Sequence, residues 1–476
     1  MDARKVVGFA VGPIFSGVLG IVTLPVLAWT FSAADVGRLS MLQVLTAAGV
    51  VFFSFGLDQA YVRDFHDVDH KTRPKLLIAA ILPGLLFILF MALALVVAAP
   101  GFLSDLAFGL ESVSWSIGII AAVILALVSR FFSLVLRMRE QGFAFSFSQT
   151  LPKLLFLLVV CAAWVYGWTS FSVLLWANVA TLTLVLMGFA LYTKDAWLPG
   201  ITEVPDWVAM RRMFRFGAPL VIGGVASWVV MTQAKLLLRH YSTMEELGHY
   251  SVAASLASAV GIATFVFTTI WVPTVYKWHS QGDAWPRVCE ASKHVTAASC
   301  LILVIAGMFS PLAALVLPER YAVVPFLVPA CTTLPLYYAL SEATAVGLGL
   351  SRRTIYSMLA SLVAAVAGLV VGSLLVSDLG SRGAALAAIA ASATFVLCRT
   401  ELASRAWQPI PRKGAYLWIV LLSVASGAYV LYGHESSGGW LLAWTGLLII
   451  TIYYFRFSVR LGIGFSLRML RAWRIR

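Results

Sequence analysis

The chain has 476 residues, of which 61% are hydrophobic and 12% are charged, and its formal net charge is +13. A soluble fold carries about 25% charged residues, so this composition excludes a water-soluble protein and predicts an integral membrane protein. The basic residues lie in short loops between apolar runs, which is typical of topology signals rather than of a nucleic-acid-binding surface, and no nucleic acid partner is expected.

A membrane-spanning helix needs about 20 mainly apolar residues, and about fourteen segments meet that requirement. The first follows two basic residues, but at residues 6–30 it is too long for the apolar core of a signal peptide, so it is expected to be a retained helix. The expected spans are residues 6–31, 39–60, 77–99, 113–136, 148–167, 171–193, 216–238, 249–272, 294–317, 325–347, 355–376, 384–400, 415–432 and 440–456.

Residues 194–215 form the longest polar interval in the chain and separate two sets of spans. Two features before this interval recur after it at nearly the same offset. Pro13 matches Pro219, and the segment SAADVGRLS, with Gly37, matches STMEELGHYS, with Gly248. This pattern predicts a duplicated half with residues 194–215 as the linker, although two basic loops before two helices also look alike by chance.

The distribution of Lys and Arg predicts the orientation in the membrane. If the N-terminus is cytoplasmic, the opposite side holds only Arg38, Arg239, Arg320 and Arg382, and nearly all other basic residues fall on the cytoplasmic side. This bias supports an even number of spans with both termini in the cytoplasm.

The remaining polar segments are short and contain no motif for catalysis. There is no GxxxxGK[ST] phosphate loop, no HExxH and no metal-ligand cluster, so no ATP hydrolysis, metal or cofactor is expected. The five cysteines do not form a disulfide framework. The tail, residues 457–476, interleaves arginines with apolar side chains, which predicts either a basic amphipathic helix on anionic lipid or a plain topology anchor.

Helix-breaking and small residues mark two further features. Gly12, Ser16 and Gly20 are spaced by four on the first helix, where they would let another helix approach closely. Some prolines fall inside or at the ends of spans, where each acts either as a bending point or as a static packing element. These prolines are Pro13, Pro25, Pro219 and Pro273.

Three basic residues lie at least three residues inside the expected spans, where a charge costs about 2.5–3.5 kcal/mol at the bilayer centre. Arg130 and Lys153 are on consecutive helices at similar depth. They either extend to the membrane interface or form one cationic cluster that faces a cavity. Lys235 lies near the outer end of its span, with the same two interpretations open. A cationic cluster would suit an anionic substrate.

Two acidic residues also lie within the spans. Glu342 is the deepest, and carboxylates reach the interface poorly, so it is a candidate for coupling to an ion gradient. Asp58 lies at the inner end of the second span close to Arg63, and a local ion pair between these two residues is expected.

Several segments together resemble the Wzx-type oligosaccharide flippases of the multidrug/oligosaccharidyl-lipid/polysaccharide exporter superfamily, and the resemblance covers most of the first 400 residues. The segments are FGLDQAYVR (55–63), MRRMFRFGAPLVIGG (210–224), QAKLLLRHYSTMEELGHYSVA (233–253) and LGSRGAALA (379–387). One departure is that the family often has Asp-Arg where this chain has Ala234 and Lys235. The lysine keeps the positive charge without the bidentate geometry, and the missing acid weakens any ion-coupling role there.

The resemblance implies an all-α integral membrane protein with two pseudo-symmetric six-helix lobes around a central cavity. The lobes would be residues 1–193 and 216–400, joined by the cytoplasmic linker 194–215. Residues 401–456 would then form two extra helices outside this core, followed by the basic tail 457–476.

The resemblance also implies a function and a location. The protein would flip undecaprenyl-pyrophosphate-linked oligosaccharide repeat units, such as those of O-antigen, across the bacterial inner membrane by alternating access, with membrane lipids and the polysaccharide polymerase machinery as further partners. Substrate contacts are expected at Arg130, Lys153, Lys235 and Arg63, and ion coupling at Glu342 and Asp58.

Alternatives stay open at this point. They are a lipid II flippase, a multidrug or cation antiporter, and a membrane glycan polymerase or transferase. A cation site favours acids without competing bases, and polymerases usually have a sizeable external loop, neither of which this sequence offers.

Overall fold

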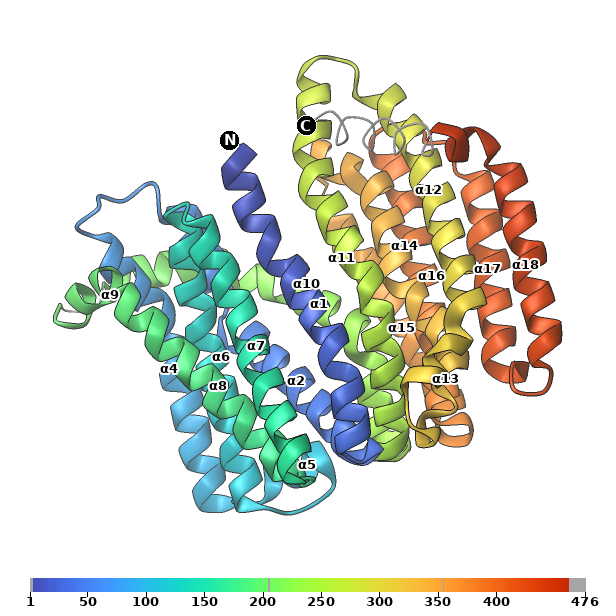
Figure 1. The fold of residues 1–476 in the computed structure, drawn as a ribbon. Coiled ribbons are helices and arrows are strands. Elements are labelled where there is room, and N and C mark those ends of the chain that lie inside the picture. Colours follow the sequence, from blue (N-terminus) through green and yellow to red (C-terminus); the bar gives the residue numbers. More distant parts are fainter. Residues whose placement is uncertain (1–2, 204–205, 354, 462–476) are drawn as a thin grey trace, which may run out of the picture. The chain divides into compact units, whose positions relative to one another are not determined.

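The computed structural model describes residues 3–203, 206–353 and 355–461, and within these ranges the chain is helical and has no strand (Figure 1). Thirteen of the described helices are long and apolar enough to cross a membrane, and the last helix is a further, shorter apolar one. The protein is therefore an all-α, multi-pass membrane protein, as its composition predicted. The basic tail lies almost entirely outside the described residues.

The chain divides into two compact units, Met1–Ser255 (unit 1) and Leu256–Arg476 (unit 2), each of which is a helical bundle. The helices of unit 1 are α1 (Ala3–Thr30), α2 (Ala33–Phe53), α3 (Leu57–Asp64), α4 (Arg73–Ala98), α5 (Phe102–Phe108), α6 (Val113–Met138), α7 (Gly142–Tyr166), α8 (Phe171–Tyr192), α9 (Lys194–Ile201) and α10 (Trp207–Tyr241). Helix α11 (Met244–Ser280) begins in unit 1 and continues into unit 2.

Unit 2 contains the remaining described helices. They are α12 (Ala284–Phe309), α13 (Ala313–Val316), α14 (Val324–Leu350), α15 (Ile355–Leu379), α16 (Ser381–Ala406), α17 (Lys413–Tyr432) and α18 (Ser437–Tyr454), with 3-10 turns at Ser310–Leu312 and Glu319–Tyr321. The predicted lobe boundaries, which treat residues 194–215 as a linker, stay a prediction.

All fourteen predicted spans overlap helices, but the second is wrong at its end, and the ninth, residues 294–317, runs past the end of α12 at Phe309 into a 3-10 turn and α13. Residues 39–60 do not form one helix, because α2 ends at Phe53 and α3 starts anew at Leu57. Phe55 and Gly56 between them have positive φ values of 48° and 69°. Left-handed backbone ends a helix, so the chain changes direction here and points the following side chains into unit 1.

The same break gives a close crossing with α10. A Cβ on Gly217 would lie 2.6 Å from the carbonyl oxygen of Gly56, so the two backbones touch where neither residue has a side chain. These glycines belong to the segments FGLDQAYVR and MRRMFRFGAPLVIGG, which are far apart in sequence. Glycine is needed in both segments because α10 crosses the break between α2 and α3 closely at this point.

The repeated segments contact each other reciprocally at the starts of α2 and α11. A Cβ on Gly37 would overlap the carbonyl oxygen of Met244, and a Cβ on Gly248 would overlap that of Ala33. Both pairs of equivalent residues, Gly37 with Gly248 and Ala33 with Met244, are separated by 211 positions. Each glycine therefore contacts the residue equivalent to the partner of the other glycine. Such a reciprocal contact is typical of two copies related by a two-fold axis, which supports the predicted duplication.

The cores of the spans are apolar, and small residues decide where helices touch. On α1, a Cβ on Gly12 would lie 2.5 Å from the Cα atom of Ser146 on α7, and Ser16 donates to the carbonyl of Gln149 at 2.7 Å. Gly20 has nothing within 4 Å, so only the first two of the three predicted small positions make this contact. Pro13, Pro25, Pro219 and Pro273 all lie inside continuous helices, and their role as hinges stays a prediction.

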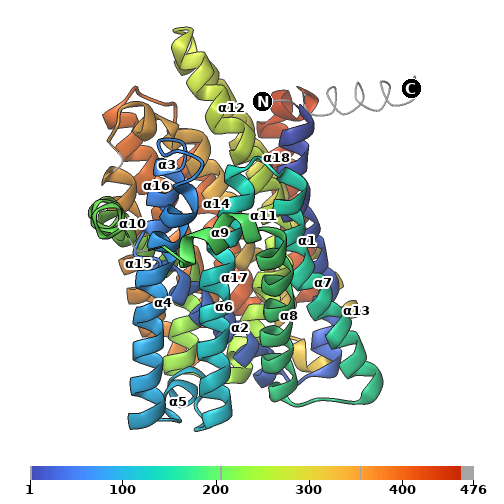
Figure 2. The same cartoon turned by 90° about the vertical axis from the view of Figure 1, so that its left-hand side faces the viewer.

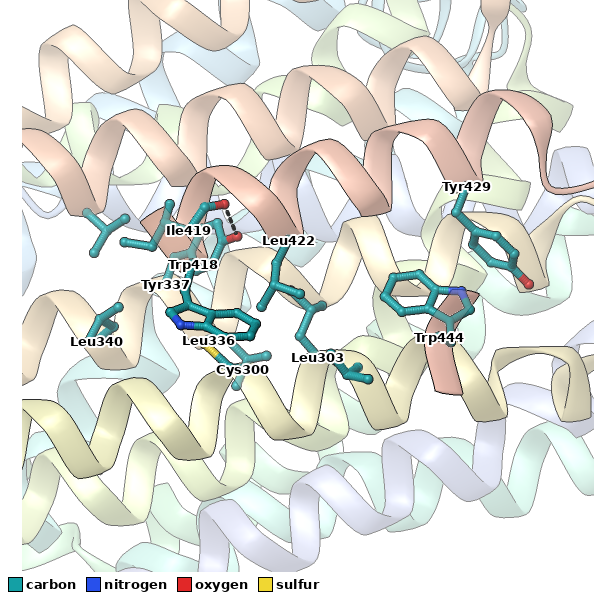
Figure 3. Packing of buried hydrophobic residues seen from close by; sticks show 12 residues of the cluster. Cys300, Leu303, Leu336, Tyr337, Leu340, Trp418, Ile419, Leu422, Tyr429 and Trp444 are labelled. Carbon is teal, nitrogen blue, oxygen red and sulfur yellow. Dashed lines mark hydrogen bonds between the residues drawn. The ribbon is translucent and has the colours of Figure 1, made fainter. Parts of the chain in front are cut away.

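Helices α17 and α18 pack on unit 2 through aromatic side chains (Figure 3). Trp444 is only 1% exposed, and a Cβ on Gly307 of α12 would lie 2.5 Å from its ring, so the glycine makes room for the indole. Tyr337 of α14 donates to the carbonyl of Ile419 on α17 at 3.1 Å. These two helices therefore share one core with α12 and α14.

Candidate functional site

The structure brings Arg130 and Lys153 to one cavity in unit 1, which lies between α2, α6, α7 and α8 and has a volume of about 320 Å³. This arrangement is compatible with the predicted cationic cluster that faces a cavity, which stays a prediction. Its other polar lining residues are Ser129, Ser133, Ser148 and Gln149. A small cavity with two cations and several hydroxyl groups is suited to holding an anion or water within the bundle.

Arg130 forms an ion pair with Asp58, with 3.1 Å between its Nη2 atom and the carboxylate Oδ2 atom. Asp58 is 8% exposed, and it also accepts a hydrogen bond from Gln59. The predicted pair between Asp58 and Arg63 is wrong, because Arg63 instead pairs with Asp64 at 2.5 Å. Residues five apart on a helix point in different directions, so Asp58 turns into the bundle while Arg63 stays at the surface.

Lys153 reaches across to the first helix. Its ammonium group donates to the carbonyl oxygen of Ser16 at 3.1 Å, which links α7 to α1. Arg130 pairs with Asp58, which is not among the residues that line the cavity, and the hydrogen-bond partner of Lys153 is a backbone carbonyl. The described residues that line the cavity therefore include two cations and no acid, and a charge in a membrane-spanning region is costly.

The other two predicted substrate residues lie elsewhere. Lys235 is half-buried in the last turns of α10 and does not line this cavity. Arg63 lines a separate surface groove with the arginines at the start of α10. The four predicted basic residues therefore do not form a single site within unit 1.

Glu342 has a partner that sequence reasoning missed. Arg399 on α16 pairs with it at 2.5 Å, and the same guanidinium donates to Ser341 at 2.9 Å and to Ser357 at 3.3 Å. Arg399 lies at the end of the expected span 384–400, and the two residues are too far apart in sequence for any local pattern. The signal for this pair in the sequence was that Glu342 and Arg399 have opposite charges and lie near the corresponding ends of two expected spans, 325–347 and 384–400.

The ion pairs of the two units occupy related positions. Helices α6 and α14 start at residues 113 and 324, which is the offset of the repeated segments. Under the predicted duplication, Arg130 and Glu342 lie at nearly corresponding positions of α6 and α14, and each is paired within its own unit. The two residues have opposite charge.

Unit 2 contains a larger cavity, of about 1210 Å³, that the sequence did not reveal. It lies between α12, α14, α16, α17 and α18. The hydroxyls of Thr344 and Thr400 hydrogen-bond to each other at 2.7 Å in its wall, and Lys293, Arg412 and Lys413 also line it. The described residues include no cluster of three or more acidic, His or Cys side chains that could hold a metal ion.

Comparisons with known proteins agree with this architecture. A family profile described as Polysaccharide biosynthesis protein matches residues 3–279. No curated protein sequence matches the chain.

The fold is also found in solved transporters. It is similar to the lipid II flippase MurJ in an inward closed conformation, with a TM-score of 0.70 and 14% identity over 94% of this chain and 97% of that chain. It is similar to a multidrug resistance MATE family transporter of the MOP superfamily in an inward-facing conformation, with a TM-score of 0.55 and 13% identity over 90% and 96% of the two chains. At these identities the likeness concerns the fold alone.

Proposed function

Because the chain belongs to the Polysaccharide biosynthesis protein family, we propose that it flips an undecaprenyl-pyrophosphate-linked oligosaccharide from the cytoplasmic to the periplasmic leaflet of a bacterial inner membrane. A bare charge in a medium of low dielectric constant costs on the order of tens of kcal/mol, and each unsatisfied hydroxyl costs more. The sugar pyrophosphate therefore needs a polar path, while the lipid tail stays in the bilayer. The proposed orientation has both termini in the cytoplasm, as the distribution of Lys and Arg favours.

The observation that carries the proposal is the convergence of Arg130 and Lys153 on one cavity in unit 1. Both are hydrogen-bond donors, and together they exceed the charge of Asp58. We assign them to the pyrophosphate or the sugars, with Arg130 exchanging its bond to Asp58 for the incoming anion. Lys235 is kept as a further candidate contact on α10.

Ion coupling is assigned to Glu342 and Asp58. Each is a largely buried acid that forms an ion pair with an arginine of the same unit, at 2.5 Å for Glu342 and 3.1 Å for Asp58. Protonation of either carboxylate would remove its attraction for the arginine, which gives a proton gradient a means of acting on each unit separately.

The test is reconstitution of the full chain in liposomes. The sidedness of an undecaprenyl-diphosphate-linked oligosaccharide would be followed with and without a proton gradient, with lipid II as the comparison substrate. Faster movement of the oligosaccharide lipid in the gradient is expected. Movement of lipid II alone would refute the assigned substrate, and movement that ignores the gradient would refute proton coupling.

The role of Arg130 is separated from its structural pairing by a cycle of variants. Arg130→Gln leaves Asp58 without its partner, whereas the double variant with Asp58→Asn removes both charges. If Arg130 binds substrate, binding of the oligosaccharide lipid and flipping are lost in Arg130→Gln and in the double variant although folding recovers in the latter, whereas Asp58→Asn alone keeps the binding of the lipid. If flipping recovers, the arginine only neutralises Asp58. Arg137→Gln, on the same helix but outside the cavity, is the control.

A further inference from the structure

A second basic site lies at the surface of unit 1, in a groove of about 1250 Å³ formed by α3, α4 and the first turns of α10. The residues that line it are Arg63, Pro83, Trp207, Val208, Met210, Arg211, Arg212, Phe214, Arg215 and Phe216. We call it the α10 groove. It is separate from the cavity that Arg130 and Lys153 line.

The charges of the α10 groove are only partly neutralised. Asp64 accepts from Arg63 at 2.5 Å and lies 3.4 Å from Arg212, but its own side chain is buried behind them. Arg211 and Arg215 are exposed, and among the described side chains they have no hydrogen bond or ion pair. The groove thus contains the guanidinium groups of Arg211 and Arg215 beside Arg63 and Arg212, which both pair with the buried Asp64.

The polar atoms of the α10 groove are almost all donors. Its lining contains no Ser, Thr, Asn, Gln, Asp or Glu. Arginine donates hydrogen bonds and cannot accept them, so sugar hydroxyls, which also donate, would be left without acceptors. A phosphate diester is an acceptor only, and planar guanidinium groups match its oxygens in pairs. The groove is therefore complementary to phosphate rather than to a glycan.

Apolar side chains of the same segment are unusually exposed. Trp207 is 64% exposed, Val208 is 81% exposed and Phe214 is 43% exposed, whereas Met213 is fully buried and anchors the helix to the unit. Part of α10 is seen nearly end-on in Figure 2 while α4 runs up the page, so this part of the helix lies across its neighbours. Arginines interleaved with exposed Trp and Phe on such a segment are typical of the membrane interface.

We propose that the α10 groove binds the headgroup of an anionic phospholipid from the leaflet that the proposed orientation places at the cytoplasm. Arg211 and Arg215 contact its phosphate, and an acyl chain lies along Trp207 and Phe214. Arg63, which also lines the groove, was predicted to contact the substrate. In this proposal the phosphate in its groove belongs to a lipid of the surrounding bilayer. A bound lipid would hold the start of α10 at the interface.

The test measures lipid binding without the transport substrate. The full chain is purified, and its retention of phosphatidylglycerol against phosphatidylcholine is measured by native mass spectrometry and by the rise of its melting temperature on lipid addition. The variant is Arg211→Gln with Arg215→Gln. The control is Lys71→Gln with Lys194→Gln, which removes two exposed charges from the same unit outside the groove.

The wild type and the control are expected to prefer phosphatidylglycerol equally. The groove variant should bind it roughly tenfold to thirtyfold more weakly, since a basic residue near an anionic surface contributes about 1 kcal/mol. An unchanged preference in the groove variant, or an equal loss in the control, would overturn the proposal. Protection by a short isoprenyl diphosphate but not by phosphatidylglycerol would also overturn it, in favour of a loading site for the carrier.

Both replaced arginines are exposed, so the groove variant is expected to fold, and its melting temperature in phosphatidylcholine alone verifies this. The outcome is independent of the proposed transport function, because no flipping is measured. A protein that binds the lipid but flips nothing would retain this inference and contradict the other proposal.

Discussion

The ion pair between Glu342 and Arg399 allows a quantitative test of whether a charge in the membrane is structural or functional. The side chains of both residues are largely buried, with 15% and 16% exposed. Besides the carboxylate, Arg399 donates to Ser341 and Ser357. Arg399→Gln therefore removes an ion pair and two hydrogen bonds, and leaves a carboxylate without its cation in a membrane span.

The expected loss can be estimated from these contacts. Breaking one side of a buried pair costs about 3–5 kcal/mol, because the remaining charge is not compensated. Glu342→Gln should cost less, about 1–3 kcal/mol, since the new amide oxygen can still accept from Arg399. The double variant should be more stable than Arg399→Gln alone by about 2 kcal/mol, because no isolated charge remains.

The assay is reversible unfolding of the purified chain in mixed micelles of mild detergent and SDS, combined with gradient-driven flipping of each variant. If Glu342 couples ions, the double variant regains stability but not the response to the gradient. Recovery of both properties would show that the pair is only structural. If the two single variants and the double variant all unfold like the wild type, the reasoning from burial and pairing is refuted.

Three further predictions concern glycines at close helix contacts. Gly12→Ala should lower the free energy of unfolding by about 1–3 kcal/mol, because the added methyl group overpacks against α7. Gly20→Ala, in open space, should be neutral or raise the free energy of unfolding by up to about 1 kcal/mol. Equal melting temperatures of the two variants would contradict the contact. Gly307→Ala should displace Trp444 and lower the melting temperature, with a change in indole fluorescence, and an unchanged spectrum would argue against the packing. Gly248→Ala should separate the starts of α2 and α11 and lower the unfolding free energy by about 1–3 kcal/mol, and wild-type stability would refute the reciprocal contact.

Much of the secondary structure could be predicted from the chain itself, because each span is long, apolar and bounded by polar residues. The same contrast made the charges within the spans visible, so Asp58, Arg130 and Glu342 were singled out before any contact was known. The sequence also predicted a duplication. The capping residues Ser32 and Thr243, which accept from backbone amides three residues on, belong to the two repeated segments.

The sequence could not show which faces of the helices pack against each other. Many spans are apolar all round, so periodicity does not identify a packing face, and lipid and protein neighbours select similar residues. The partners of Asp58 and Glu342 are 72 and 57 residues away, and local spacing wrongly suggested Arg63 for the first. The break at Phe55 and Gly56, after which Asp58 is buried, lies at the close contact between Gly56 and Gly217 of α10, which is far away in sequence.

The sequence by itself therefore determined that this protein is a multi-pass helical membrane protein, and it predicted a repeat and charges within the spans. Hydropathy and charge along the chain act locally and are sufficient for that. Only the tertiary structure decided that Arg130 and Lys153 share one cavity while Arg63 faces another groove. Those placements depend on side chains from helices distant in sequence, which meet because backbones approach at a few glycines and because a buried charge must find its counter-charge.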